Sequence, residues 1–199
     1  MDRPYNILIA GVGGQGNLLA GSVLAEAAAL AGYRPVVGEI YGASRRGGRV
    51  MTHVRIWKED LGPLIPAGHT DFLIGLEPVE TIWAADVLCS ERSVVVMNKA
   101  VVPTLSTLTG LEKYPSVENI EKALKEICGS LFVMDATDTL NEFNNPKALN
   151  MFFLGSLVAL GKSPLSKEQI TEGIKKNLRN PASSIAIFER GIEISSKLA

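Results

Sequence analysis

The residues best placed for chemistry near the start of the chain are glycines that directly follow an apolar run. Gly11, Gly13 and Gly16 stand at G-x-G-x-x-G spacing after residues 7–10, and an Ala- and Leu-rich stretch begins at once. In a strand–turn–helix unit such glycines permit a sharp turn and close approach of a ligand, and the helix N-terminus favours an anion. The candidate phosphate-binding turn consists of Gly11, Gly13, Gly14, Gln15 and Gly16. A tight turn that binds nothing is the alternative.

A second concentration of polar groups lies in residues 45–49, where three arginines flank two glycines. Guanidinium groups bind carboxylate or phosphate through paired hydrogen bonds, and glycines open backbone conformations closed to other residues. We expect an anionic partner here, either a phosphorylated ligand or acidic residues of another chain; a solvated loop would bind nothing. The candidate contact residues in this segment and just before it are Glu39, Tyr41, Arg45, Arg46, Gly47, Gly48 and Arg49.

Polar residues also follow later apolar runs of the chain, at Glu77, Asn98 and Asp135. Ligands of parallel α/β sheets bind at the carboxyl ends of the strands, so we add Glu77 and Asn98 to the candidate contacts. Polar loops occur at this edge without any ligand, which is the alternative. Glu39 stands near the usual ribose-binding acid of dinucleotide-binding folds, but the basic loop that follows it is unlike a plain ribose site.

The order of periodic segments predicts a doubly wound α/β fold with a mostly parallel, Rossmann-like sheet, helices on both faces and a helical C-terminal segment. Expected strands cover residues 7–10, 34–40, 50–57, 72–76, 93–97 and 131–134. Expected helices cover residues 17–31, 78–85, 146–160, 166–178 and 181–197, and another begins after Ser116. Residues 98–114 are expected to be irregular. We find no repeat or linker, so residues 1–199 are expected to form one domain.

The segment at residues 50–57 is the clearest alternating strand. Val50, Thr52, Val54 and Ile56 are expected to face the core. The opposite side carries Met51, His53, Arg55 and Trp57, a mixture that suits a contact surface, although cover by the chain's own residues is equally consistent with it.

Composition and cysteine count exclude several classes of function. The formal net charge is −1, so nothing global indicates nucleic acid or an anionic membrane, and no membrane span or signal peptide is expected. Two cysteines cannot hold a cubane iron–sulfur cluster, and the two histidines lack metal-ligand spacing. We expect a cytoplasmic protein with no catalytic residue and no metal or cofactor of its own.

Two motifs together resemble a known family. Gly-Val-Gly-Gly-Gln-Gly after a strand, followed by residues 39–49, is similar to the gamma-type subunit of 2-oxoacid:ferredoxin oxidoreductases. Residues 53–55, 63–71 and 75–80 resemble the beta subunit of indolepyruvate:ferredoxin oxidoreductase in particular, and the likeness covers nearly the whole chain. The sequence departs from that branch at Ala43-Ser44-Arg45, where the branch commonly has Met-Ala-Gln, which leaves the 2-oxo acid open.

The resemblance implies a chain that supports oxidation of a 2-oxo acid with coenzyme A to acyl-CoA, carbon dioxide and reduced ferredoxin. Thiamine diphosphate, magnesium and iron–sulfur clusters are then expected in a large partner subunit, with coenzyme A as co-substrate and ferredoxin met through the complex. The isolated chain is expected to be inactive. The alternatives are a stand-alone NAD-dependent oxidoreductase or a nucleotide-sensing module; no acid–base pair is placed by motif for the first.

Overall fold

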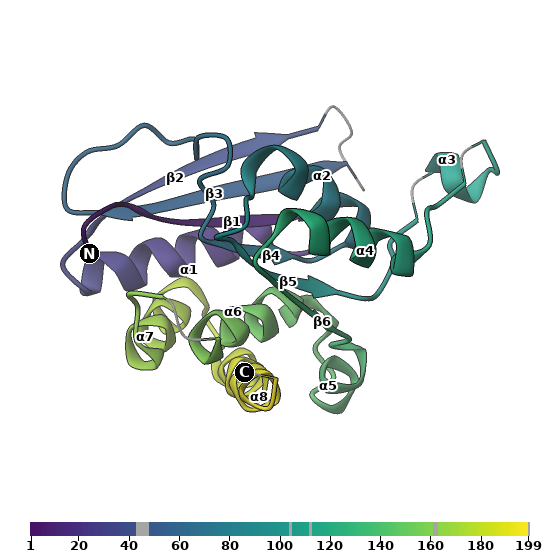
Figure 1. Ribbon diagram of the computed structural model, residues 1–199. Helices are drawn as coiled ribbons and strands as arrows, with labels where there is room; N and C mark the ends of the chain where they lie inside the picture. The colour runs from purple at the N-terminus through teal and green to yellow at the C-terminus, as the bar shows by residue number, and fades with distance from the viewer. Residues whose placement is uncertain (43–47, 104, 112, 161–162, 199) are drawn as a thin grey trace.

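The computed structural model of the protein describes residues 1–42, 48–103, 105–111, 113–160 and 163–198 (Figure 1). Within these ranges six strands form one twisted sheet in the order β2-β3-β1-β4-β5-β6. Neighbouring strands from β1 to β6 are parallel, whereas β3 is antiparallel to both β1 and β2, so the other strands all point one way. The strands are β1 (Tyr5–Val12), β2 (Arg34–Tyr41), β3 (Arg49–Trp57), β4 (Phe72–Gly75), β5 (Val94–Asn98) and β6 (Ser130–Met134).

The reversed strand β3 brings the two candidate motifs to the same edge of the sheet. Val12, at the end of β1, is paired with Arg49, at the start of β3. Just beyond that pair, the Gly13 amide donates to the Gly48 carbonyl at 3.0 Å, and the Gly42 amide donates to the Arg49 carbonyl at 2.7 Å. The glycine turn and the two ends of the basic loop therefore lie side by side at the carboxyl edge.

One face of the sheet carries the helices α1, α6, α7 and α8, which share the larger hydrophobic core with it (Figure 1). Helices α6 and α8 cross closely because each contributes a glycine: a Cβ on Gly155 would lie 2.4 Å from the Phe188 carbonyl oxygen, and one on Gly191 2.1 Å from that of Phe152. These helices are α1 (Asn17–Leu30), α6 (Leu149–Ala159), α7 (Lys167–Asn177) and α8 (Ala182–Ser196).

The opposite face is covered by α2 (Pro78–Leu88), α4 (Val117–Ile127) and the loop after β3, around a second core. That loop covers the polar side of β3. The Arg55 guanidinium donates to the carbonyls of Gly62 and Leu64, and His53 Nδ1 accepts from the Ile65 amide. The predicted core set of β3 is confirmed as buried, and its polar side is covered by the chain's own residues rather than left as an open contact surface.

Local signals predicted the helix ends well. The Ser116 hydroxyl caps α4, Ser166 and Gln169 form the expected capping box of α7, and Gly32 follows α1 at a φ of 81°. Two short helices were not expected: α3 (Leu105–Leu108), inside a segment predicted to be irregular, and α5 (Thr137–Glu142). The predicted helix at 146–160 begins as a 3₁₀ turn, η1 (Pro146–Ala148). No helix within the described ranges has the length and apolarity to cross a membrane.

Candidate functional site

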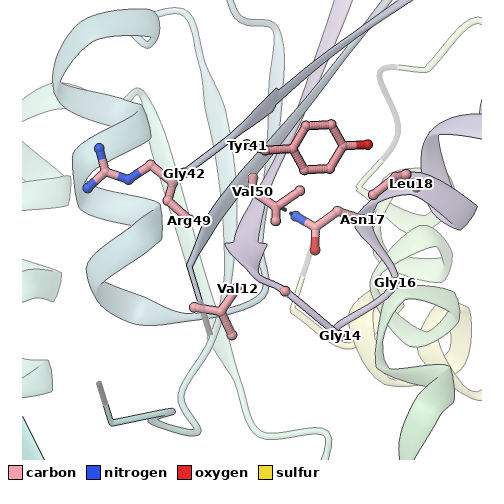
Figure 2. A pocket seen from close by; sticks show the side chains of 10 residues that line it. Val12, Gly14, Gly16, Asn17, Leu18, Tyr41, Gly42, Arg49 and Val50 are labelled. Carbon is pink, nitrogen blue, oxygen red and sulfur yellow. Dashed lines mark hydrogen bonds between the residues drawn. The ribbon is translucent and has the colours of Figure 1, made fainter. Parts of the chain in front are cut away.

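A cavity of about 400 Å³ opens at the carboxyl edge, between the glycine turn and the hairpin of β2 and β3 (Figure 2). Its wall comes from four segments that are distant in sequence: the end of β1, the first turn of α1, the end of β2 and the start of β3. The lining residues are Val12, Gly13, Gly14, Gly16, Asn17, Leu18, Tyr41, Gly42, Arg49 and Val50.

The turn needs glycine at two positions because of its backbone conformation. Gly14 has a φ of 102° and Gly16 a φ of 82°, both in the region that L side chains rarely adopt. Gly16 is also the N-cap residue of α1, which has no side-chain cap and no acidic residue in its first turn. The first amide groups of α1 therefore lack the usual side-chain acceptor, and the positive end of the helix dipole meets the cavity.

Amide side chains brace the turn from inside. Gln15 Oε1 accepts from the Val12 backbone amide at 2.8 Å, and Gln15 Nε2 donates to the Leu76 carbonyl at 3.0 Å. Asn98 Nδ2 donates to the same carbonyl at 3.2 Å, which joins the turn to the ends of β4 and β5. Asn17 donates to the Val50 carbonyl at 3.0 Å, and this bond joins α1 to β3. The turn is thus shaped before any ligand arrives.

A fourth amide reaches the turn from the C-terminal part of the chain. Asn150, in α6, is 1% exposed, and its Nδ2 donates to the Gly16 carbonyl at 2.9 Å. A Cβ on Gly16 would lie 2.5 Å from that nitrogen, so no larger residue fits there unless Asn150 moves. The contact makes the first turn of α1 depend on α6.

Arg49 lies at the cavity wall, but its guanidinium is engaged elsewhere. Nε donates to Glu80 Oε2 at 2.6 Å, and the guanidinium carbon lies 4.7 Å from the centroid of the Trp83 ring. Figure 2 shows the side chain pointing away from Tyr41 and Asn17. Burial raises the pKa of Glu80, and the bond to Arg49 opposes that rise. Arg49 therefore ties the hairpin to α2 in this conformation.

Glu77 is an internal anchor of the carboxyl edge. It is 2% exposed and caps α2 by accepting from the Glu80 amide at 3.0 Å. Its other oxygen accepts from the Tyr114 hydroxyl at 2.5 Å and from the Val102 amide at 3.4 Å. Val102 and Tyr114 lie on either side of α3, which stands away from the body (Figure 1), so Glu77 holds both ends of that excursion.

The predicted site residues differ in where they lie relative to the cavity. The structure brings Gly13, Gly14, Gly16, Tyr41 and Arg49 to one cavity. Glu39 is exposed near its rim, where it accepts from the Tyr41 hydroxyl at 2.5 Å; this bond raises the pKa of Tyr41. The remaining described members act from within or behind the turn: Gly11, Gln15, Gly48, Glu77 and Asn98. Arg45, Arg46 and Gly47 lie outside the described residues.

Sequence reasoning missed four residues that shape this site. Asn17 and Leu18 belong to the first turn of α1. They directly follow the glycine turn in the sequence, and this position could have identified them. Glu80 lies one helical turn after Glu77, the cap of α2. Pro78 marks the start of this helix in the sequence, so the position of Glu80 in the first turn could also have been predicted. Asn150 gave no local signal, because its partner lies 134 residues away.

The two cysteines of the chain do not fit an iron–sulfur cluster. Cys89 and Cys128 are 7% and 9% exposed and belong to the core under α2 and α4, away from the cavity. Burial raises the pKa of the Cys89 thiol to about 12, which disfavours the thiolate that clusters need. Within the described ranges, no three His, Cys, Asp or Glu side chains gather as metal ligands.

Comparison with known proteins decides the family. A family model described as pyruvate ferredoxin/flavodoxin oxidoreductase matches residues 6–194. The chain belongs to this family. Indolepyruvate oxidoreductase subunit IorB of Thermococcus kodakarensis is 35% identical over 198 residues, which are 99% of this chain and 96% of that protein. The 2-oxoglutarate synthase subunit KorC of Archaeoglobus fulgidus is 30% identical over 200 residues, which are 100% of this chain and 91% of that protein.

Solved structures of other ferredoxin oxidoreductases share the fold. The gamma subunit of a keto/oxoacid ferredoxin oxidoreductase from Geobacter sulfurreducens matches with a TM-score of 0.65 at 22% identity, over 97% of this chain and 96% of that one. The 2-oxoglutarate:ferredoxin oxidoreductase of Magnetococcus marinus, solved with 2-oxoglutarate, coenzyme A and succinyl-CoA, matches with a TM-score of 0.72 at 21% identity. All of this chain is covered, but it spans only 32% of the Magnetococcus chain. The predicted α/β fold is confirmed.

Proposed function

We propose that the chain, acting as one domain over residues 1–199, is the small subunit of a 2-oxoacid:ferredoxin oxidoreductase. The proposed substrate is indolepyruvate or a related arylpyruvate. One observation carries this proposal: the 35% identity to an indolepyruvate oxidoreductase subunit runs over 99% of this chain and 96% of that protein. The complex would convert the 2-oxo acid and coenzyme A to acyl-CoA and carbon dioxide, with two electrons passing to ferredoxin.

Thiamine diphosphate, magnesium and the iron–sulfur clusters belong, in this proposal, to a large partner subunit. The available ligand side chains support that division. The two thiols of this chain are buried, and its described carboxylates and imidazoles do not form a group of three or more that could hold a metal ion. The chain's own contribution is then to complete the complex and to shape a binding surface for coenzyme A. Neither role requires a catalytic side chain here.

The cavity at the glycine turn is the proposed place for a phosphate group of coenzyme A. Four glycines line it, so backbone amides are approachable without side chains in the way. The uncapped start of α1 provides donors and a positive dipole end, which together favour a phosphate. Arg45 and Arg46 would add charge to this edge; their contribution stays a prediction.

Reconstitution with the large subunit tests both levels of the proposal. Wild-type chain should restore indolepyruvate- and coenzyme A-dependent ferredoxin reduction, and the chain alone should show no turnover and no bound iron. Failure of the wild type to restore activity would refute the subunit assignment. The phosphate site is tested by Leu18→Glu, which places a carboxylate at the exposed second position of α1.

We expect Leu18→Glu to raise the KM for coenzyme A with kcat little changed, because the new carboxylate competes with the phosphate for the helix dipole. Leu18→Gln is the matched control and should behave like the wild type. An unchanged KM in Leu18→Glu would remove the cavity from the coenzyme A path while leaving the subunit assignment intact. Fluorescence titration with NADH tests the alternative of a stand-alone dehydrogenase.

A further inference from the structure

A second hollow, of about 430 Å³, lies between the outer sides of α2 and α4. It is on the sheet face opposite α1 and does not share a lining residue with the cavity at the glycine turn. We name it the α2–α4 groove. It is lined by Ile82, Trp83, Asp86, Ala123, Glu126 and Ile127.

The groove follows from how the two helices pack. Ile120 and Leu124 of α4 are buried in the core that also holds Ala84 and Ala85 of α2, and this contact fixes the inner sides of the helices. On the outer side, Ala123 is too small to fill the space that faces α2. A hollow therefore remains over a well-packed base, so it is a stable feature of the surface.

The apolar area of the groove continues onto the outer surface of α2. Trp83 is 56% exposed and Val87 is 58% exposed, and they lie one helical turn apart on the same side. An exposed indole beside an exposed valine forms an apolar patch, and such patches often mark a surface that a partner covers. Tryptophan is also among the side chains that most often dominate binding at protein interfaces.

The charge of the groove specifies what covers it. Its two charged lining residues, Asp86 and Glu126, are both carboxylates, and neither takes part in a salt bridge with another described residue. Arg49 contacts the Trp83 ring, but its charge is already paired with Glu80. The charged side chains that line the groove are therefore all negative, which complements a basic surface.

We propose that the α2–α4 groove docks a helix of the large partner subunit, one that carries Lys or Arg beside an apolar stripe. This inference rests on the proposed subunit function and adds a place and a chemistry for the contact. Trp83 is the apolar anchor, Asp86 and Glu126 pair with the basic side chains, and the hollow at Ala123 accepts an apolar side chain of the docked helix.

Binding of this chain to the isolated large subunit tests the proposal. Asp86→Lys/Glu126→Lys should slow association about tenfold or more at low salt, and the difference from wild type should shrink at high salt because rim charges act through steering. Ala123→Phe should fill the hollow and speed dissociation. The control Glu59→Lys/Glu142→Lys makes the same charge change at exposed sites outside the groove and should bind like wild type.

Tryptophan fluorescence gives a second, independent measurement. The chain has two tryptophans, so Trp57→Phe leaves Trp83 as the only indole. Emission should shift to shorter wavelength when the large subunit binds, because docking takes Trp83 out of water. A Trp83 spectrum unchanged on binding, or charge-reversed and Ala123→Phe chains that bind like wild type, would overturn the docking site. If the wild-type chain did not bind the large subunit, the proposed subunit function itself would be overturned.

The other candidate occupant is a second copy of this chain, and the same variants distinguish it. Sedimentation of the chain alone should show a monomer in the wild type and in the charge-reversed variant. A concentration-dependent dimer that Asp86→Lys/Glu126→Lys abolishes would assign the groove to self-association and overturn the proposal. Unchanged melting temperatures in the variants show that binding, rather than folding, has been altered.

Discussion

Replacing Gly16 by alanine tests the account of the glycine turn most directly. Gly16 has a φ of 82°, where an L side chain costs about 1–2 kcal/mol. The added Cβ would lie 2.5 Å from Asn150 Nδ2, so Asn150 must move and its hydrogen bond to the Gly16 carbonyl is lost, which costs a further 0.5–1.5 kcal/mol or so. We expect Gly16→Ala to lower the free energy of unfolding by roughly 1.5–3.5 kcal/mol.

Gly32→Ala is the matched control for backbone strain. Gly32 has a φ of 81°, and a Cβ there would meet nothing within 4 Å. Both substitutions reduce the freedom of the unfolded chain equally, so that effect cancels in the comparison. The difference between the two variants therefore isolates the contact with Asn150.

The assay is chemical denaturation of the isolated chain, supported by thermal melting. For a chain of this size each kcal/mol lowers Tm by about 2–4 °C, so Gly16→Ala should melt on the order of 10 °C below wild type. In the double variant with Asn150→Ala the clash is absent, so the combined loss should be smaller than the sum of the two single losses. Equal losses in Gly16→Ala and Gly32→Ala, or strict additivity with Asn150→Ala, would refute the reasoning.

Three further predictions concern titrating groups. Arg49→Gln should raise the pKa of Glu80 further, so the variant should be less stable than wild type at neutral pH, with the difference shrinking as the pH falls through the raised pKa of Glu80 toward its ordinary value of 4.5, as urea titrations at several pH values can check. Burial, with Arg55 nearby, lowers the pKa of His53, so stability should be full above about pH 6.5 and fall as the pH drops through the lowered value; His53→Asn should flatten that part of the profile, and an unchanged slope would contradict it. Burial raises the pKa of both thiols, so Cys89 and Cys128 should react with a disulfide reagent only after denaturant is added; fast labelling of the native chain would show that this core opens readily.

The features that the sequence predicted correctly depend on residues that are close together in the chain. The glycine spacing after an apolar run predicted the strand, the turn and the start of α1, because each of these depends on neighbouring residues. Ser116, Ser166 with Gln169, and Pro78 marked helix starts for the same reason. The alternation in residues 50–57 separated the core side of β3 from its polar side.

The parts that could not be predicted depend on partners far along the chain. Nothing local states that β3 runs antiparallel between β2 and β1, although this placement builds the cavity. From the sequence, Arg49 is expected in the basic loop, but it begins β3, and its side chain is hydrogen-bonded to Glu80. Glu77 has the position of a ligand-binding residue, yet its burial makes it an anchor for Tyr114 and Val102.

The bond between Asn150 and Gly16 also sets an order of events during synthesis. The glycine turn leaves the ribosome early, whereas its donor follows 134 residues later. At about 5–20 residues per second, the nascent chain spends several seconds or more with the Gly16 carbonyl lacking this partner. The larger core is also incomplete during that interval, because α6 and α8 supply much of one side of it. The N-terminal half should therefore remain protease-sensitive until α6 has emerged, and the glycine turn gains its hydrogen bond from Asn150 only then.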